Sequence, residues 1–247
     1  MPGERILVFG GTGDARLLAG ALIEAGFAVI TALAGVTSAP LLPPGEIHRG
    51  GFGGKAGISA FVARGGIAAI VDATHPFAVQ ISRHACGAAA DRGIPYLRLE
   101  RPPWVAEPGD RWIEVHSMEA AVAALPQAAR VMLTVGRKEL HLFLARPDLA
   151  GIARMIEEPA AELPAGWTLI LERPPFSVES ERQLIGKYRI GYLIAKNSGG
   201  EDTRAKLIAA RERKIPVVMV ARPVKPDGPS FRSADDLIPA LRRMLYP

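Results

Sequence analysis

A glycine-rich segment near the N-terminus has the residue types to bind phosphate groups. It reads Phe9-Gly10-Gly11-Thr12-Gly13-Asp14-Ala15-Arg16, and it lies between an apolar run and an apolar pattern of helical spacing. Glycines let the backbone turn sharply and approach a pyrophosphate, and the start of a helix offers free N–H groups. The spacing departs from G-x-G-x-x-G, so a tight turn without a ligand is the alternative. Its position at the first strand–helix turn favours a dinucleotide site.

The residues after the second apolar run bear on which dinucleotide would bind. The stretch from Thr31 to Ser38 contains no acidic residue. An acid there would bind the ribose 2′-hydroxyl of NAD and repel a 2′-phosphate. Its absence favours NADP, with Thr37, Ser38 and Arg49 as possible donors to the phosphate. The alternative is that these residues only form the loop.

Another candidate segment, Asp72-Ala73-Thr74-His75-Pro76, begins at the end of the expected strand 68–74 and continues beyond it. In open α/β sheets, ligands lie beyond the carboxyl ends of the strands, so Thr74 and His75 are expected to contact cofactor or substrate. Packing or helix capping is the alternative for His75. Pro76 fits the first turn of a helix.

Cationic segments mark the second half of the chain. Arg137 and Lys138 are expected at a helix start, where positive charge opposes the helix dipole and therefore adds no stability. The turn from Lys196 through Ser198 to Gly200 is typical of an anion cradle, and Arg204 continues it into a helix. The alternative for each is solvated surface charge.

Composition limits the possible partners of the 247-residue chain. It carries 30 basic and 25 acidic residues, for a net charge of +5, and 23 of the basic residues are arginine. Arginine forks suit carboxylates and phosphates, so an anionic small molecule is favoured. The basic residues form no stripe, so we expect no nucleic-acid partner.

Targeting and metal signals are weak. Cys86 is the single cysteine, which makes an internal disulfide impossible and favours a reducing compartment. Cysteine and histidine spacing predicts no metal site. We expect no signal peptide and no membrane span, hence a cytoplasmic protein.

Strand and helix patterns alternate along the chain, which predicts parallel sheets joined by right-handed crossovers. Expected strands are 5–9, 27–33, 47–52, 68–74, 96–100, 112–116, 130–135, 152–157, 168–172, 192–195 and 217–221. Expected helices are 15–25, 57–64, 77–92, 118–125, 137–145, 178–188, 201–214 and 234–245. The pattern breaks at Arg101-Pro102-Pro103-Trp104. We therefore predict the α/β class with two Rossmann-like domains of mostly parallel sheets, 1–105 for the dinucleotide and 106–247 for the substrate.

The motifs GGTGDAR, DATHPFA, RPPW, TVGRKEL and AKNSGGEDTRAKLIAARERKIPVVMVARP together closely resemble the precorrin-6A reductases of cobalamin biosynthesis. The resemblance covers nearly the whole chain. It implies reduction of a ring D double bond of precorrin-6A by a nicotinamide hydride, giving precorrin-6B. It also implies NADP(H) and an anionic tetrapyrrole bound between two Rossmann-like domains, in a monomer or weak homo-oligomer.

The resemblance also suggests roles by position. Residues expected to bind NADPH are Gly10, Gly11, Thr12, Gly13, Asp14, Arg16, Thr37, Ser38, Thr74, His75 and Pro76. Residues expected to meet substrate carboxylates are Arg137, Lys138, Lys196, Ser198 and Arg204. The proton donor stays open between Lys138, Lys196, His75 and a bound water.

Three alternatives remain. The substrate could be the cobalt-containing macrocycle of the oxygen-independent pathway. A short-chain reductase or epimerase is a second alternative, because Tyr192 and Lys196 have the Tyr-x-x-x-Lys spacing of such enzymes. The two residues span the expected strand 192–195, however, and side chains four residues apart in a strand are separated by about 13 Å. The chain could also be an NADP-binding module without catalysis.

Overall fold

The chain, described here by a computed structural model for residues 3–33 and 41–247, divides into two compact units. The first consists of Met1–Pro102 together with Pro223–Pro247, and the second is Pro103–Arg222. Thr37 and Ser38 lie outside the described residues, so their expected contacts with a 2′-phosphate stay a prediction.

The described part of the first unit has a six-stranded parallel sheet in the order β12-β5-β4-β1-β2-β3. Its strands are β1 (Arg5–Phe9), β2 (Ala28–Leu33), β3 (Glu46–Arg49), β4 (Ile67–Asp72), β5 (Tyr96–Leu99) and β12 (Ser230–Phe231). Its helices are α1 (Gly13–Glu24), α2 (Lys55–Gly65), α3 (Val79–Arg92) and α8 (Ala234–Leu245). This strand order is that of doubly wound dinucleotide-binding folds.

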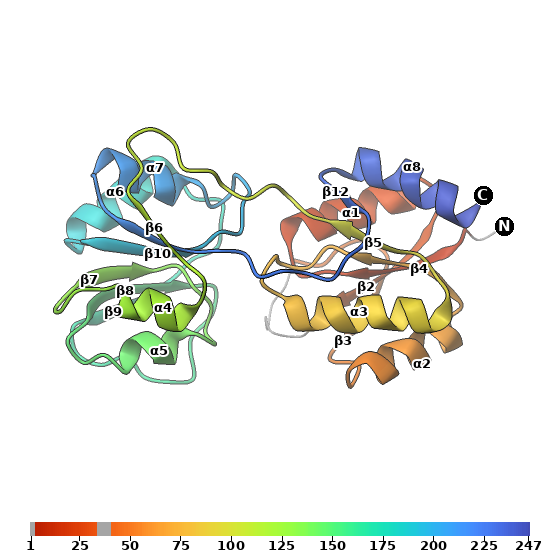
Figure 1. Cartoon of the computed structure of the whole chain (residues 1–247), viewed down its shortest axis with the longest axis horizontal. Helices are drawn as coiled ribbons and strands as arrows, with labels where there is room; N and C mark the ends of the chain where they lie inside the picture. The colour runs from red at the N-terminus through yellow and green to blue at the C-terminus, as the bar shows by residue number, and fades with distance from the viewer. Residues whose placement is uncertain (1–2, 34–40) are drawn as a thin grey trace. The chain divides into compact units, whose positions relative to one another are not determined.

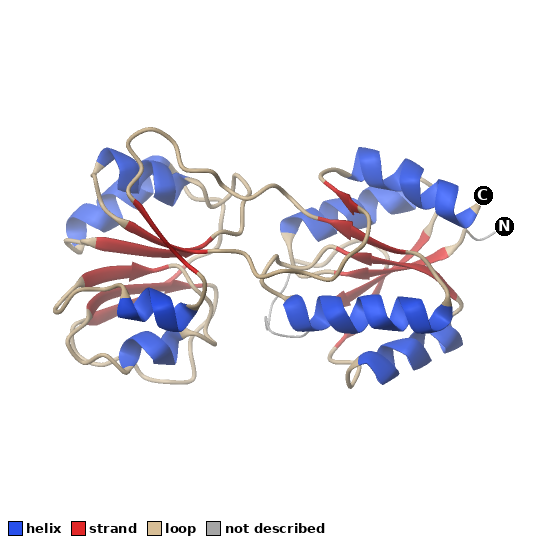
Figure 2. Cartoon of the chain, in the orientation of Figure 1, coloured by secondary structure: helices blue, strands red, loops and turns tan. Residues whose placement is uncertain are grey.

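The continuous apolar run of β1 is explained by helices on both faces of the sheet, as Figure 2 shows. Ile6 and Val8 point into one core cluster with residues of α1 and α8, whereas Leu7 and Phe9 point into another with residues of α2 and α3. A buried parallel strand has no solvent side, which is why its sequence does not alternate with polar residues.

The second unit, over the residues described, repeats this architecture in the order β6-β11-β10-β7-β8-β9, again with parallel neighbours only. Its strands are β6 (Trp112–Val115), β7 (Arg130–Leu133), β8 (Ala150–Met155), β9 (Trp167–Leu171), β10 (Tyr192–Lys196) and β11 (Val217–Val220). Its helices are α4 (Met118–Ala123), α5 (Leu140–Leu144), α6 (Val178–Lys187) and α7 (Ala205–Glu212). Helices α6 and α7 cover one face and α4 and α5 the other (Figure 1). The predicted α/β class with two parallel sheets is confirmed.

The expected domain boundary needs a correction at the C-terminal end. The first break, predicted after residue 105, lies at Pro102/Pro103, but residues 223–247 return to the first unit instead of completing the second. Burial explains the return, because Leu237 and Leu241 of α8 belong to the core that β1 and α1 share. The strand β12, which the sequence did not predict, pairs with β5 at the edge of that sheet.

Two helices of the second unit begin later than expected. Helix α5 begins at Leu140 rather than 137, and α7 begins at Ala205 rather than 201. In each case a turn precedes the helix: the Glu139 amide donates to the Gly136 carbonyl at 3.2 Å, and the Arg204 amide donates to the Glu201 carbonyl at 3.0 Å. The cations Arg137 and Lys138 therefore lie in a loop, and the argument from the helix dipole does not apply to them.

Over 3–33 and 41–247, no helix combines the length and apolar character that crossing a membrane requires. The same residues bring together no group of three or more histidine, cysteine or acidic side chains that could hold a metal ion.

Candidate functional site

The first unit has a topological switch point between β1 and β4. From β1 the chain proceeds to β2 and β3 on one side, whereas β4 and β5 lie on the other. The loops after β1 and β4 therefore leave the sheet in opposite directions, which is where ligands of such sheets bind. A hydrogen bond joins the two loops: the Thr12 hydroxyl donates to the Ala73 carbonyl oxygen at 3.0 Å.

The glycine-rich turn leads directly into α1. Thr12 is the N-cap residue, and its hydroxyl oxygen accepts the Ala15 amide at 3.0 Å. The amides of Gly13 and Asp14 open the helix, where partners within the helix are lacking. Gly11 has a φ of 105°, a value that favours glycine, and a Cβ there would meet no described atom within 4 Å. The turn is therefore exposed and has the geometry to receive a phosphate.

Close approach explains another glycine of this turn. A Cβ at Gly10 would lie 2.8 Å from the Thr31 methyl carbon, so a side chain would push the turn away from β2. The Gly10 amide donates to the Ala32 carbonyl oxygen at 3.0 Å, which holds the turn against the neighbouring strand.

The acid at the start of α1 is balanced by a cation from the crossover segment. Asp14 forms an ion pair with Arg101 at 2.8 Å, and both side chains are partly exposed. Asp14 alone would repel a phosphate at this helix end. The ion pair reduces that repulsion, which makes Asp14 compatible with the expected site. Arg16 lies two residues further along α1 and is half-buried.

Among Thr74, His75 and Pro76, which are expected to bind the cofactor, His75 reaches the surface. Thr74 and Pro76 are buried, whereas His75 is partly exposed and its Nδ1 accepts the Phe77 amide at 3.3 Å. The Thr74 hydroxyl points inward and donates to Asp72 at 2.6 Å. Its side chain therefore supports the loop from within. A direct contact with the cofactor is expected instead from His75 and from the backbone of the loop.

Sequence reasoning missed a buried polar cluster beneath this loop. Asp72 is completely buried and accepts bonds from the Thr74 amide at 3.0 Å and the Tyr96 hydroxyl at 2.9 Å. The Lys225 ammonium lies 3.4 Å from the same carboxylate and donates to the Thr74 hydroxyl at 3.1 Å. Lys225 belongs to the returning C-terminal segment, so no local motif could have linked it to Asp72.

Charge determines how this cluster ionises. Burial alone would raise the pKa of Asp72, but the Lys225 charge and the hydrogen bonds from Ser82 and Thr74 outweigh it and hold the pKa below its ordinary value. Burial, together with the Asp72 carboxylate, raises the pKa of Tyr96. The carboxylate is therefore ionised and the phenol neutral at pH 7.

The second unit has its own switch point, between β7 and β10. The chain proceeds from β7 to β8 and β9 on one side, whereas β10 and β11 lie on the other. The loops after β7 and β10 are the two that carry most of the cations expected to bind substrate. A direct ion pair links the last residue of β10 to the loop after β7, with Lys196 Nζ 2.6 Å from Glu139 Oε1. Lys196, Arg137 and Lys138 are thus brought together at the carboxyl ends of the strands.

The cations after β7 differ in their surroundings. Arg137 forms an ion pair with Glu157 at 3.3 Å and donates to the Glu158 carbonyl at 3.4 Å, which directs it toward the end of β8. Lys138 is exposed. A solvated lysine beside an oriented arginine can hold carboxylates of a large anion, since the arginine supplies direction and the lysine a mobile charge.

The loop after β10 is fixed by both segments that lead into the second unit. Asn197 accepts the Trp104 amide at 2.8 Å and donates to the Trp104 carbonyl at 3.0 Å. Arg222 donates to the Asn197 carbonyl at 2.7 Å and to the Ser198 carbonyl at 2.9 Å. Ser198 is buried within this loop, so its expected contact with substrate depends on its backbone.

The side chain of Arg204 is paired with acidic residues of the second unit. Its guanidinium forms ion pairs with Glu107 and with Glu201, and Arg211 joins the same network through Glu107 and Asp110. This network fastens the segment before β6 to α7. A role for Arg204 toward substrate stays a prediction, although its charge is already balanced by two carboxylates.

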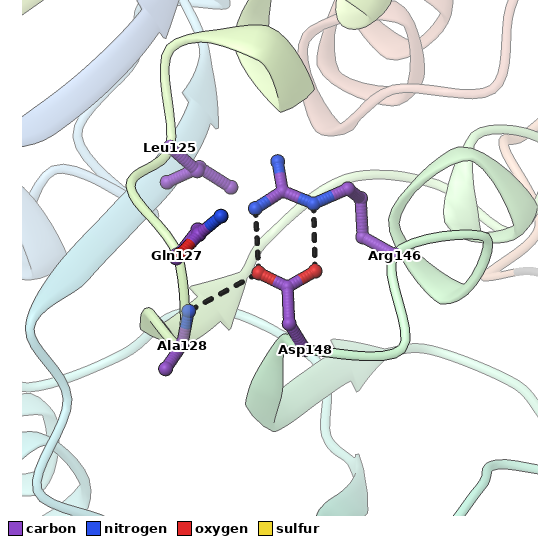
Figure 3. A pocket seen from close by; sticks show the side chains of 5 residues that line it. All are labelled: Leu125, Gln127, Ala128, Arg146 and Asp148. Carbon is purple, nitrogen blue, oxygen red and sulfur yellow. Dashed lines mark hydrogen bonds and ion pairs between the residues drawn. The ribbon is translucent and has the colours of Figure 1, made fainter.

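An open hollow of about 680 Å³ lies on the other side of the second sheet, next to the amino-terminal ends of its strands (Figure 3). Arg146 and Asp148 line it in a two-pronged ion pair, and Asp148 also accepts the Ala128 amide at 3.1 Å. These polar groups are already bonded to one another. The hollow contains none of the expected site residues, and the position of the switch points is the better guide to function.

Comparison with known proteins decides the family. The family model described as Precorrin-6x reductase CbiJ/CobK matches residues 5–242. The chain belongs to this family. It is 44% identical to the precorrin-6A reductase of Rhodococcus erythropolis over 96% of both chains, and 42% identical to that of Rhodobacter capsulatus over 90% of this chain and 89% of that one.

A relative named for a different substrate is also similar. The cobalt-precorrin-6A reductase of Priestia megaterium is 32% identical over 96% of this chain and 97% of its own. A solved structure of a CobK precorrin-6A reductase superposes with a TM-score of 0.92 at 40% identity, covering 98% of this chain and 97% of that one. The family expected from the motifs is therefore confirmed, and the chain is an oxidoreductase of cobalamin biosynthesis.

The precorrin-6x reductase fold also fits the cofactor that such a reaction needs. An exposed glycine turn, a capped helix start and a loop bearing His75 meet at the first switch point, as a nicotinamide dinucleotide would require.

Proposed function

We propose that this chain reduces a ring D double bond of precorrin-6A with NADPH, giving precorrin-6B and NADP⁺. The observation that carries the proposal is the pair of switch points, one with a phosphate-type glycine turn and the other with clustered cations. NADPH supplies the hydride, and one proton from a protein group or water completes the addition of two hydrogens. The protein's own contribution is position and charge.

The cofactor belongs to the first unit. Amides at the start of α1 bind the pyrophosphate, and His75 lies beside the nicotinamide. The register of the sheet supports NADPH over NADH, because Arg49 of β3 is paired with Leu33, the last residue of β2. An arginine at this place meets a 2′-phosphate, where NAD enzymes present an acid.

The tetrapyrrole belongs to the second unit. Its acetate and propionate groups meet Arg137, Lys138 and Lys196, whose charges orient the ring before hydride transfer. The candidates for the proton donor are Lys138, Lys196, His75 and a bound water. We infer a cytoplasmic enzyme, monomeric or weakly associated.

Relatives favour the metal-free macrocycle. The precorrin-6A reductases cited are 42–44% identical to the chain, against 32% for the cobalt-precorrin-6A reductase. Reduction of cobalt-precorrin-6A is the second candidate function.

The deciding experiment follows the absorbance of NADPH at 340 nm with precorrin-6A, and compares NADH and cobalt-precorrin-6A in parallel. Turnover with NADPH and precorrin-6A supports the proposal. Turnover with the cobalt macrocycle alone moves the chain to the second candidate. NADPH binding without turnover on either macrocycle would contradict both and favour a binding module.

A further inference from the structure

The starting observation is a buried ion pair at the switch point of the first unit. Asp72 ends β4, and Lys225 reaches it from the segment that returns from the second unit. Both side chains are almost fully shielded from water, with 0% and 2% of their areas exposed. Prolines at 223 and 226 flank Lys225 and restrict the backbone that delivers it.

The pair is connected to the glycine turn by a continuous chain of hydrogen bonds. Lys225 and Asp72 both bond to the Thr74 hydroxyl, and Asp72 also accepts the Thr74 amide. One residue earlier, the Ala73 carbonyl accepts the Thr12 hydroxyl. Thr12 in turn caps α1. The conformation of residues 73–74 therefore fixes the acceptor that Thr12 needs.

Stability alone is a poor explanation for such a pair. Removing two charges from water is costly, and apolar residues of similar volume often replace a buried ion pair without loss of stability. A buried pair does, however, specify one arrangement of the backbone around it. Its place under two ligand-binding loops makes that arrangement functional.

We propose that Asp72 and Lys225 are positioning residues for NADPH binding: they hold the loop after β4 so that Thr12 and the start of α1 meet the cofactor's pyrophosphate. This inference rests on the proposed function of the first unit. Neither side chain touches the cofactor, because both are almost fully buried.

The test replaces both charges at once, so that no unpaired buried charge is left. The double variant Asp72→Asn, Lys225→Met keeps side chains of similar volume, and the amide oxygen of asparagine can still accept from Thr74. The control is the equally buried ion pair of the second unit, Arg154 and Glu181, joined at 2.6 Å. Its double variant is Arg154→Met, Glu181→Gln.

The measurements are the Kd for NADPH by calorimetry, the KM for precorrin-6A at saturating NADPH, and thermal unfolding of each protein. We expect the Asp72/Lys225 variant to bind NADPH about tenfold more weakly, since misplacing a positioning contact weakens binding at a distance. Its KM for precorrin-6A stays unchanged. The Arg154/Glu181 variant keeps the wild-type Kd for NADPH.

Each other outcome overturns the inference. A folded Asp72/Lys225 variant with the wild-type Kd for NADPH contradicts it and leaves the proposed function intact. Equal weakening toward NADPH and precorrin-6A indicates a general loosening of the fold, which also contradicts it. Wild-type protein that does not bind NADPH overturns the proposed function itself and, with it, this inference.

Discussion

The hydroxyl of Thr12 donates to the carbonyl oxygen of Ala73, and this bond ties the loop after β1 to the loop after β4. The same oxygen atom of Thr12 accepts the Ala15 amide at the start of α1. A single side chain therefore caps the helix that would bind phosphate and fixes the neighbouring loop. Loss of this hydroxyl should affect both stability and cofactor affinity.

Replacing Thr12 tests this dual role. Thr12→Ala removes the cap and should lower the free energy of unfolding by about 1 kcal/mol. It should also raise the Kd for NADPH, because the loop after β4 loses its bond to the turn. Thr12→Ser keeps the hydroxyl and should restore both properties. Denaturant unfolding and calorimetry check the two effects, and wild-type NADPH affinity in Thr12→Ala would contradict the second.

Replacing the loop cations of the second unit tests the substrate assignment. Arg137→Ala with Lys138→Ala should raise the KM for precorrin-6A far more than the KM for NADPH, since the lost charges face carboxylates. Lys187→Ala, an exposed cation at the end of α6, serves as the control and should change neither constant. Steady-state kinetics with each ligand varied in turn measure the split. A change in thermal stability alone would mean that the two cations do not bind substrate.

Two replacements of Lys196 separate charge from proton donation. Lys196→Arg keeps the positive charge beside Glu139 but cannot give up a proton near neutral pH. If Lys196 is the proton donor, this variant loses kcat at nearly unchanged KM. If Lys196 only binds a carboxylate, Lys196→Arg remains active and Lys196→Ala raises KM. Single-turnover decay of NADPH absorbance distinguishes the two results.

The pKa of Asp72 predicts how stability depends on acid. Its pKa is below the ordinary value of 3.8 in the folded chain, so the folded state binds fewer protons than the unfolded state. The contribution of Asp72 to stability is thus complete above the unfolded pKa and is lost as pH falls through the folded one. The free energy of unfolding should decline more steeply for wild type than for Asp72→Asn, Lys225→Met as the pH falls below about 4. Parallel declines in urea titrations would contradict this assignment.

Cofactor choice should depend on Arg49. Arg49→Ala removes the cation paired in register with the end of β2 and should reduce the preference for NADPH over NADH. Arg49→Glu should reduce it further, because an acid repels the 2′-phosphate and accepts from a ribose hydroxyl. The ratio of kcat/KM for the two cofactors measures the effect. Exposed Arg64, in the last turn of α2, provides the control as Arg64→Ala.

Local patterns were sufficient to predict most elements of this chain. The apolar run of β1 and the glycine turn depend on adjacent residues, and both were visible in the sequence. Arg137 and Lys196 were also correctly placed at the ends of their strands, although Arg137 was expected in a helix and lies in a loop. Lys196 reaches the loop of Arg137 through its ion pair with Glu139. That contact depends on the order of the strands in the sheet, which a local pattern does not reveal for two residues 57 positions apart.

Contacts across long separations account for what sequence reasoning missed. Lys225 and Asp72 are 153 residues apart, and nothing near Lys225 marks it as the partner of a buried acid. The strand β12 has two residues, too few for a periodic signal. The return of α8 to the first unit was also missed. An amphipathic pattern predicts that a helix packs against a hydrophobic core, but it does not identify the domain to which that core belongs.

The discontinuous first unit has a consequence for dissecting the chain. A fragment cut after residue 105 would lack β12 and α8, and would leave the apolar side chains of α1 that face Leu237 and Leu241 open to water. The second unit is an insertion whose two ends, Trp104 and Arg222, bond to the same Asn197. It can be excised as one continuous gene segment, whereas the first unit requires Pro102 to be fused to Pro223 before it can be produced alone.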